Sequence, residues 1–294
     1  MNKSLLTLRG RDLLSIGDLD AAELHAVLDL AAEMKAGRQR ERPLAGRAVA
    51  MLFQKPSMRT RVSFEVGIRR LGGYPVALGE QDVQIGVRET VADAAHVLSR
   101  YVDAIVARMR RHQDLVELAA AASVPVVNAL TEVEHPCQVL ADVLTMKEKL
   151  GGVAGKRLVF VGDGNNIARS LWLASQRLGF ELTVVGPRAY ALPEAPSICT
   201  ADVGAVAGAD AVYTDVWTSM GFEAERERRL ADFRGYEVDA ALMARAPRAI
   251  FMHCLPAHRG EEVSDDVIDG PRSVVLEQAE NRLHAQMALL ALIA

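Results

Sequence analysis

Short, uninterrupted runs of aliphatic residues alternate along this chain with longer stretches in which apolar and polar positions recur at helical spacing. An uninterrupted apolar run is typical of a strand that is buried on both faces, as the strands of parallel sheets are. We therefore expect strands at 47–53, 75–79, 104–108, 125–129, 157–162, 181–186, 211–217, 249–254 and 273–276. The helical stretches between them give the strand–helix–strand order of an α/β protein.

Two of the expected helices stand out, one for the residues at its ends and the other for its place at the end of the chain. In the first, at 21–36, Asp20 is placed to cap the helix, Glu23 completes a capping box, and Gly37 is placed to end it. The second, at 280–293, is the last element of the chain. We expect this last helix to return to the first half of the chain.

A stretch rich in glycine and charge, KEKLGGVAGKR at 147–157, separates the first group of expected strands from the second. Such stretches are common at domain boundaries. We expect two doubly wound α/β domains, 1–149 and 150–279, each with a central, mostly parallel sheet flanked by helices. The C-terminal helix, 280–294, is expected to complete the first domain.

Composition and charge exclude several classes of protein. Hydrophobic residues make up 50% and charged residues 24% of the 294 positions, as in globular proteins. The net charge of −4 gives no general attraction to nucleic acid or to an anionic membrane. The chain has no apolar run of about 18 residues, and its charged beginning does not have the form of a secretory signal.

Cysteine and histidine usage narrows the chemistry further. Cys137, Cys199 and Cys254 form an odd, sparse set without a CxxC pair, which argues against a disulfide framework and a zinc ribbon. We therefore expect a cytoplasmic protein. His253 and His258 have no third metal ligand in a recognisable spacing, so we expect no metal.

The segment FQKPSMRTR, at 53–61, joins an expected strand to an expected helix. Ligands of α/β proteins bind at the carboxyl ends of strands, and a helix N-terminus offers free N–H groups and partial positive charge. With the hydroxyls of Ser57 and Thr60 and the fork of Arg59, the segment suits a phosphate dianion. The alternative is an ordinary helix cap beside surface arginines. The Gly-rich Walker pattern is absent.

Polar groups suited to a carbonyl and an amide follow the next strands. Arg108 ends the strand 104–108, and the sequence His135-Pro136-Cys137-Gln138 opens a helix after 125–129. A neutral histidine donates to a carbonyl oxygen, and a glutamine pairs with an amide. Read alone, the histidine sequence favours an ordinary helix start with an incidental histidine.

The second half carries groups suited to an amino acid. The loop GDGNN, at 162–166, resembles a dinucleotide fingerprint but has Ile167 where that motif needs a small residue. The segment DVWTSMG, at 215–221, lies at the end of the expected strand 211–217. Within it, Asp215 is suited to pair with an amine, and Ser219 is suited to hold a carboxylate. The alternative for Asp215 is a turn-forming role.

The last strand end combines a thiol with an X-Pro bond. Cys254 either faces a ligand or is inert packing, and the Leu255-Pro256 bond is a candidate cis peptide. Arg282, near the start of the last helix, is placed to reach a site or is a surface charge.

Taken together, the order of these motifs resembles the ornithine carbamoyltransferases. The resemblance runs from about Leu13 to the end and is carried by FQKPSMRTRVSFEVG, VQIG, HPCQVLAD, GDGNN, DVWTSMG, HCLPAHRGEEV and QAENRLHAQ. It implies transfer of the carbamoyl group of carbamoyl phosphate to the δ-amine of ornithine, without a cofactor. It also implies a homotrimer, or a multiple of trimers, with active sites at subunit boundaries.

The resemblance also implies roles for individual residues. Catalysis would involve Arg59, Arg108, His135 and Cys254. Carbamoyl phosphate would be bound by Ser57, Met58, Arg59, Thr60, Gln84 from the neighbouring subunit, Arg108, His135, Gln138, Cys254, Leu255 and Arg282. Ornithine would be bound by Asn166, Asp215, Ser219 and Met220.

Two departures from the family pattern keep alternatives open. Met58 stands where the family often has Thr, and the same motif occurs in relatives that use N-acetylornithine, although DVWTSMG and HCLPAHRGEEV resemble the ornithine users. The connection 187–210 is short for the family. The alternatives are a sister enzyme using N-acetylornithine or putrescine, and a non-catalytic paralogue that binds carbamoyl phosphate. A nicotinamide oxidoreductase is disfavoured by Ile167 and Gly186.

Overall fold

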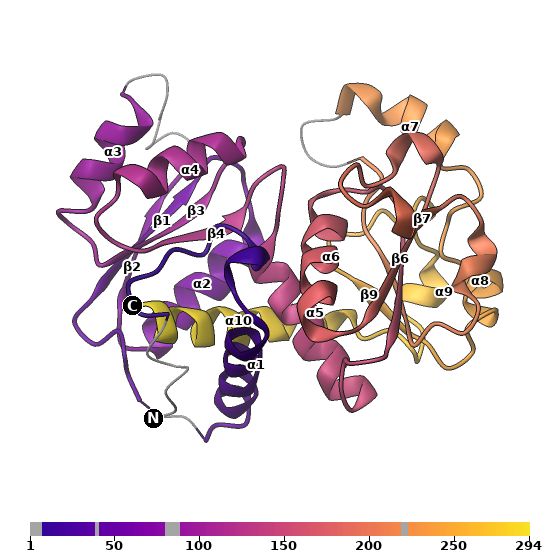
Figure 1. Cartoon of the computed structure of the whole chain (residues 1–294), viewed down its shortest axis with the longest axis horizontal. Coiled ribbons are helices and arrows are strands. Elements are labelled where there is room, and N and C mark those ends of the chain that lie inside the picture. The colour runs from indigo at the N-terminus through magenta and orange to yellow at the C-terminus, as the bar shows by residue number, and fades with distance from the viewer. Residues whose placement is uncertain (1–7, 39–40, 80–88, 219–222) are drawn as a thin grey trace. The chain divides into compact units, whose positions relative to one another are not determined.

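A computed structural model describes residues 8–38, 41–79, 89–218 and 223–294. The chain forms two compact units. The first unit contains the chain up to Leu144 together with Glu280–Ala294, and the second contains Thr145–Ala279. Figure 1 shows that each unit has its own sheet with helices on both faces.

The sheet of the first unit is parallel throughout, in the order β2-β1-β3-β4. Its strands are β1 (Ala48–Phe53), β2 (Tyr74–Leu78), β3 (Ala104–Arg108) and β4 (Val126–Leu130). On one face lie α3 (Val91–Leu98) and α4 (His112–Ala121) (Figure 1). The other helices are α1 (Ala21–Lys35), α2 (Met58–Arg70), α5 (Pro136–Leu150), which continues into the second unit, and α10 (Val275–Ile293), which comes from it.

The sheet of the second unit is also parallel, in the order β7-β6-β5-β8-β9. Its strands are β5 (Arg157–Val161), β6 (Glu181–Val185), β7 (Cys199–Thr200), β8 (Ala211–Thr214) and β9 (Ile250–His253). Its helices are α6 (Asn166–Leu178), α7 (Arg226–Asp232), α8 (Ala240–Ala244) and α9 (Asp265–Ile268). The expected fold class, two α/β domains with parallel sheets and a C-terminal helix that joins the first, is confirmed.

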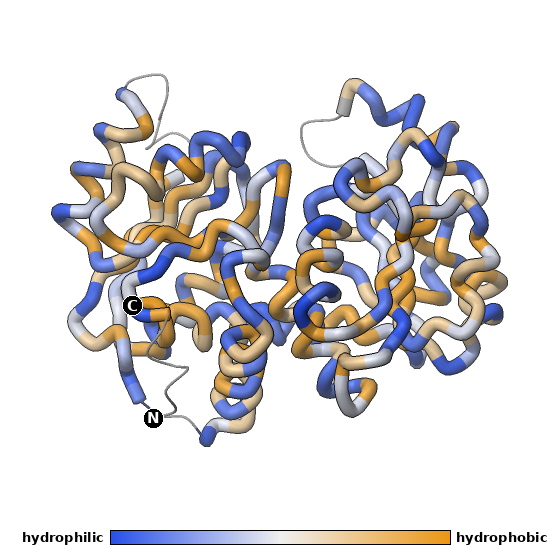
Figure 2. Tube along the Cα trace, viewed as in Figure 1, coloured by the Kyte–Doolittle hydropathy of each residue, from blue (hydrophilic) through white to orange (hydrophobic). Residues whose placement is uncertain are grey.

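Burial of the aliphatic runs explains why they form central strands. Every residue of β3 is buried, and β1 is buried from Val49 to Phe53. In the second unit, side chains of β5, β8 and β9 form a core with α8 and α9. Figure 2 shows the apolar positions concentrated along the strands. Within the described part of the chain, no helix has the length and apolar character needed to span a membrane.

The ends of α1 are those expected from the sequence. The Asp20 side chain accepts a hydrogen bond from the Glu23 N–H at 2.8 Å, and the Glu23 carboxylate accepts from the Asp20 N–H at 3.0 Å. Gly37 follows the helix with a φ of +68°, in the left-handed region that glycine adopts without strain.

Three expectations for individual elements were wrong or incomplete. No strand forms at 273–276: only Ser273 bridges Phe251, and α10 has already begun at Val275, earlier than the expected start at 280. The helix begins there because the Gln278 N–H already bonds to the Val274 carbonyl at 2.9 Å. The strand expected at 211–217 ends at Thr214, so Asp215 lies in the loop after it. The short connection 187–210 contains β7, a two-residue strand at the edge of the sheet.

Candidate active site

The N-terminus of α2 forms the first part of the candidate site. Ser57 caps the helix, because its Oγ accepts a hydrogen bond from the Thr60 N–H at 3.3 Å. The N–H groups of Met58 and Arg59 lie in the same first turn, where no preceding helical carbonyl is available to them. The Met58 side chain is 71% exposed, so at this position the backbone, not the side chain, is the group that can bind an anion.

Buried cationic and polar side chains lie beside this helix terminus. Arg108 ends β3, His135 precedes α5, and Arg282 lies on α10, and all three are at most 5% exposed. Arg282 Nη2 donates to Thr60 Oγ1 at 2.8 Å. Burial, and then the charges of Arg282 and Arg108, hold the pKa of His135 well below its usual range. His135 is therefore a neutral hydrogen-bonding group between arginines.

Gln138 is fixed in one orientation inside the same unit. Its Nε2 donates to Asp142 Oδ1 at 2.8 Å, and a carboxylate accepts only from the NH₂ side of the amide. The Gln138 side-chain oxygen is therefore directed elsewhere; it is buried and has no hydrogen-bond partner among the described residues. An oriented, unsatisfied acceptor of this kind can bind the NH₂ group of a small amide.

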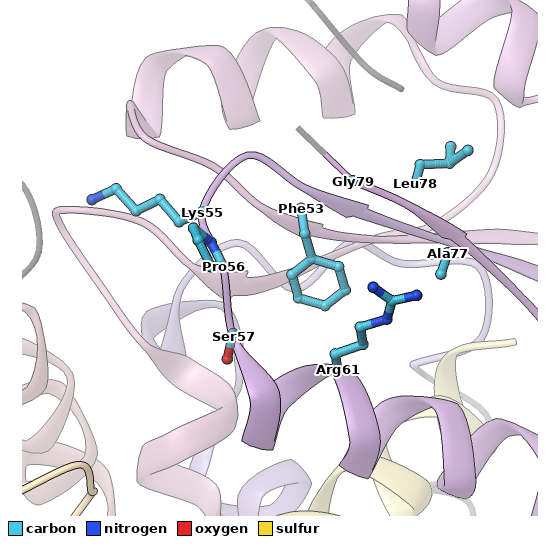
Figure 3. Close-up of a pocket in the computed structure, with 8 residues that line it drawn as sticks. All are labelled: Phe53, Lys55, Pro56, Ser57, Arg61, Ala77, Leu78 and Gly79. Atoms are coloured by element: carbon cyan, nitrogen blue, oxygen red, sulfur yellow. The ribbon is translucent and has the colours of Figure 1, made fainter. Parts of the chain in front are cut away.

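A hollow of about 170 Å³ opens at the ends of β1 and β2 (Figure 3). Figure 3 shows the Arg61 side chain directed toward the ring of Phe53, whereas Lys55 points away from it. Its lining residues are Phe53, Lys55, Pro56, Ser57, Arg61, Ala77, Leu78 and Gly79. Only Ser57 belongs both to this hollow and to the predicted site, so the hollow adjoins the cluster without containing it.

In the second unit, the carboxylate of Asp215 connects three strand-end loops. Its Oδ2 accepts from Asn165 Nδ2 at 2.9 Å, and its Oδ1 accepts from the Cys254 thiol at 3.0 Å and from the Val216 N–H at 2.8 Å. Asn165 follows β5, Asp215 follows β8, and Cys254 follows β9, which are neighbouring strands. Asp215 is only 9% exposed, so its position is fixed by these contacts.

The loop that carries Cys254 is supported by a buried histidine and a buried glutamate. His253 Nδ1 accepts the Leu255 N–H at 2.8 Å, which places the ring proton on Nε2, 3.2 Å from Glu262 Oε1. The His253 and Glu262 side chains are both fully buried. Leu255 has a φ of +56°, unusual for a residue with a side chain, and its bond to Pro256 is cis, as the sequence suggested.

Donor atoms of Asp215, His253 and Cys254 lie within 4.8 Å of one another, a spacing that would also suit a metal ion. Both ring nitrogens of His253 are engaged, however, with Leu255 and Glu262. Binding a metal through His253 would break one of these buried hydrogen bonds. A second such group consists of His258, Glu261 and Glu262. The expectation that the chain uses no metal stays a prediction.

Close backbone approach explains the second glycine of GDGNN without a nucleotide. A Cβ on Gly164 would lie 2.4 Å from the Leu192 backbone nitrogen, so only glycine fits there. The next residue, Asn165, caps α6 by accepting from the Ile167 and Ala168 N–H groups. The loop thus packs tightly and presents the Asn165 amide to Asp215 at the same time.

The structure divides the predicted site residues between the two units. The first unit holds Ser57, Met58, Arg59, Thr60, Arg108, His135, Gln138 and Arg282, and the second holds Asn166, Asp215, Cys254 and Leu255. Gln84, Ser219 and Met220 lie outside the described residues. Sequence reasoning did not select Asn165 or Glu262, although their place within GDGNN and HCLPAHRGEEV was a signal. Arg229 gave no such signal, because it stands in a charged run.

Comparison with known proteins agrees with this division. A family model described as the carbamoyl-P binding domain of aspartate/ornithine carbamoyltransferase matches residues 11–148, and the corresponding Asp/Orn binding domain matches residues 154–293. The ornithine carbamoyltransferase of Symbiobacterium thermophilum is 49% identical over 98% of this chain and 99% of its own. The anabolic ornithine carbamoyltransferase of Pyrococcus furiosus is 50% identical over 98% of both chains.

Solved structures give the same result. The ornithine carbamoyltransferase from Pyrococcus furiosus superposes with a TM-score of 0.92 at 50% identity, over 97% of both chains. The one from Thermus thermophilus gives 0.89 at 45% identity, over 96% of this chain and 99% of that chain. The fold is thus that of a two-domain α/β transferase. The chain belongs to the aspartate/ornithine carbamoyltransferase family.

Proposed function

We propose that this chain transfers the carbamoyl group of carbamoyl phosphate to the δ-amine of L-ornithine, giving L-citrulline and phosphate. Full-length similarity to ornithine carbamoyltransferases at about half identity supports it. The structural observation that carries it is the buried Asp215 carboxylate, held by Asn165 and Cys254 at the carboxyl ends of neighbouring strands. A carboxylate fixed in this way can bind and orient an amine.

The first domain, 1–149 completed by 280–294, is proposed to bind carbamoyl phosphate. Ser57, Thr60 and the N–H groups of Met58 and Arg59 would hold the phosphate at the start of α2. Arg108, Arg282 and the Arg59 fork would balance its charge. The Gln138 oxygen would accept from the carbamoyl NH₂ group.

Neutral His135 is proposed to donate to the carbonyl oxygen of the carbamoyl group. As the amine attacks, negative charge develops on this oxygen, and a donor fixed in a buried site stabilises it. Arg59 and Arg108 would stabilise the same charge and that on the departing phosphate. Carbamoyl phosphate is already activated, so the reaction needs no metal or organic cofactor.

The second domain, 150–279, is proposed to bind ornithine. Asn166, Ser219 and Met220 would hold its α-amino and carboxylate end, while Asp215 and Cys254 orient the δ-amine and Leu255 lies beside the reacting carbon. In solution this amine has a pKa near that of lysine, roughly 10, so it must lose a proton before it attacks. The amine nitrogen forms the C–N bond, and the C–O bond to phosphate then breaks. The departing phosphate takes one of the two N–H protons of the attacking amine, and the other stays in citrulline.

A homotrimer, or a multiple of it, is proposed as the assembly. Tyr74 and Val76 on the edge strand β2 are 64% and 40% exposed, and Val62 on α2 is 53% exposed. Exposed apolar side chains on and near an edge strand favour contact with another copy. Light scattering should then give a multiple of three chain masses of 31.9 kDa, and Val62→Asp should lower it. The proposal that Gln84 reaches a neighbouring site rests on the sequence alone.

The cytoplasm is proposed as the compartment. Cys137, Cys199 and Cys254 are all free thiols in the structure. Free thiols persist in reducing surroundings.

The test is product formation from carbamoyl phosphate with ornithine, N-acetylornithine, putrescine and aspartate offered in parallel. We expect citrulline from ornithine, abolished by Arg59→Ala. Activity on N-acetylornithine or putrescine alone would replace the proposal with the sister enzyme. Silence with all four, in folded protein that binds carbamoyl phosphate, would favour the non-catalytic paralogue.

A further inference from the structure

We infer that Arg229 is a positioning residue for the amino-acid site, a role that deepens the proposed function and rests on it. Arg229 lies on α7, whose other arginines, Arg226 and Arg228, are exposed. Arg229 itself is only 7% exposed. A buried guanidinium is costly unless it is fully paired, so its partners indicate what it is for.

The guanidinium of Arg229 joins two strand-end loops to its own helix. Its Nη1 donates to Asp163 Oδ2 at 2.6 Å and to the Trp217 carbonyl at 3.0 Å, and its Nε donates to Glu225 Oε2 at 3.0 Å. Asp163 lies in the loop after β5, and Trp217 in the loop after β8. One side chain therefore fixes both loops relative to α7.

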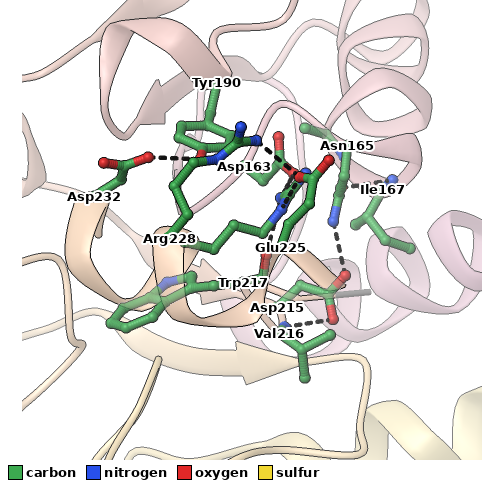
Figure 4. A network of polar contacts seen from close by, with 12 residues as sticks. Asp163, Asn165, Ile167, Tyr190, Asp215, Val216, Trp217, Glu225, Arg228 and Asp232 are labelled. Carbon is green, nitrogen blue, oxygen red and sulfur yellow. Dashed lines mark hydrogen bonds and ion pairs between the residues drawn. The ribbon is translucent and has the colours of Figure 1, made fainter. Parts of the chain in front are cut away.

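These two loops carry Asp215, which is proposed to orient the amine, and Asn165, which donates to Asp215. Asn165 follows Asp163 by two positions, and Trp217 follows Asp215 by two positions. Figure 4 shows Asp163, Glu225 and Trp217 beside the hydrogen bond between Asn165 and Asp215. Releasing the Arg229 contacts would let the Asn165–Asp215 pair move.

Aromatic packing keeps the Arg229 contacts away from water. The Trp217 ring stacks on Phe233 with centroids 5.3 Å apart, and the Tyr190 ring lies 5.0 Å from the Arg229 guanidinium carbon. Trp217 is 4% exposed. Electrostatic interactions are stronger in such surroundings. Arg229 therefore acts on the nearby carboxylates in two ways, through its hydrogen bonds and through its positive charge.

Two carboxylates, those of Asp163 and Glu225, accept hydrogen bonds from Arg229, and Glu225 also accepts one from the exposed Arg228 at 3.0 Å. Burial raises the pKa of Asp163, Arg229 opposes that rise, and the negative charges of Asp215 and Glu225 add to it. Without Arg229, the excess negative charge would stabilise the ammonium form of an amine bound at Asp215. The pH at which the bound amine becomes reactive would therefore move upward.

Charge and geometry can be separated by four variants. Arg229→Gln removes both the charge and the three-way contact, Arg229→Lys keeps the charge, and Asp163→Asn combined with Arg229→Gln restores the charge balance without the contact. Arg234→Gln is the matched control, because it removes one exposed positive charge just after the same helix. The rate of citrulline formation is measured while the concentration of ornithine, the concentration of carbamoyl phosphate and the pH are varied in turn.

We expect Arg229→Gln to raise the KM for ornithine about tenfold and to leave the KM for carbamoyl phosphate within about twofold. In a plot of kcat/KM for ornithine against pH, the rise should occur at a higher pH in Arg229→Gln than in the natural sequence. For Arg229→Lys and for the double variant, kcat/KM should rise at the same pH as in the natural sequence, while the KM for ornithine is raised. Arg234→Gln should match the natural sequence in the pH of the rise and in the KM for ornithine.

Equal losses for both substrates, or an unchanged KM for ornithine in folded Arg229→Gln, would overturn the inference. If Arg229→Gln does not fold, Arg229→Lys decides the geometric part: an ornithine KM equal to that of the natural sequence would reject it. Failure of the unmodified chain to make citrulline would instead reject the proposed function. In that case, ornithine binding followed by calorimetry across the same variants would still test the positioning role.

Discussion

Replacing Asp215 with asparagine perturbs the most connected group of the proposed ornithine site. Both carboxylate oxygens accept hydrogen bonds: Oδ1 from the Val216 N–H and the Cys254 thiol, and Oδ2 from the Asn165 amide. Asparagine has nearly the same shape, but one oxygen becomes an NH₂ group. Whichever way the new amide is turned, a donor faces a donor.

Two separate effects should follow from this substitution. The lost hydrogen bond and the unsatisfied buried donor should lower the free energy of unfolding by about 1–3 kcal/mol. The loss of a charged acceptor for the δ-amine removes a charge-assisted hydrogen bond of about 1.5–3 kcal/mol, which corresponds to a fall in kcat/KM for ornithine of about 10- to 150-fold. The first effect concerns the folded protein itself, and the second concerns only the bound substrate.

Initial rates of citrulline formation at saturating carbamoyl phosphate, with ornithine varied, measure the second effect. Asp210→Asn is the matched control, since Asp210 lies at the opposite end of β8 and accepts the Arg157 N–H at 2.9 Å. The control should keep the kinetics of the natural sequence. A folded Asp215→Asn variant whose kcat/KM for ornithine stays within about twofold of the natural sequence would refute the assignment of Asp215.

Further predictions concern buried polar groups in each unit. The pKa of His135 is depressed in the folded chain, so its contribution to stability is present above the unfolded pKa of about 6.5 and is lost as the pH falls. Between pH 7 and pH 5.5, the free energy of unfolding measured in urea should therefore fall by about 1 kcal/mol less in His135→Gln than in the natural sequence. Arg282→Gln, which loses the bond to Thr60, should raise the KM for carbamoyl phosphate about tenfold in the citrulline assay, with ornithine unaffected. Both donors to Glu262 use the same oxygen, so Glu262→Gln should keep the free energy of unfolding within about 1 kcal/mol, whereas Glu262→Ala should lower it by about 2–4 kcal/mol in denaturant titrations.

The strands could be predicted from the sequence because burial on both faces leaves an unbroken aliphatic run. The run at 104–108 and the observed β3 have the same bounds. Local chemistry was equally sufficient for α1, whose capping groups lie within three residues of one another. The run SVVL at 273–276 was misread because a short apolar run fits a buried strand and the start of a buried helix alike.

Tertiary contacts decided the features that the sequence did not reveal. Arg229 lies in the run ERERR, which is typical of a solvated helix face, and it is the folded chain that places the Tyr190 ring and the Asp163, Glu225 and Trp217 acceptors around it. Asn165 and Asn166 are adjacent, and the choice between them depends on which side chain caps α6 and faces Asp215. Such choices depend on the folded backbone and not on residue spacing.

Transfer of labelled carbamoyl carbon tests the central claim most directly. With [¹³C]carbamoyl phosphate and ornithine, NMR should show the label moving into citrulline as an equal amount of phosphate is released, and Asp215→Asn and Arg59→Ala should each suppress the transfer. Phosphate release without labelled citrulline, or citrulline formed at an undiminished rate by both variants, would contradict the proposed function or the proposed site.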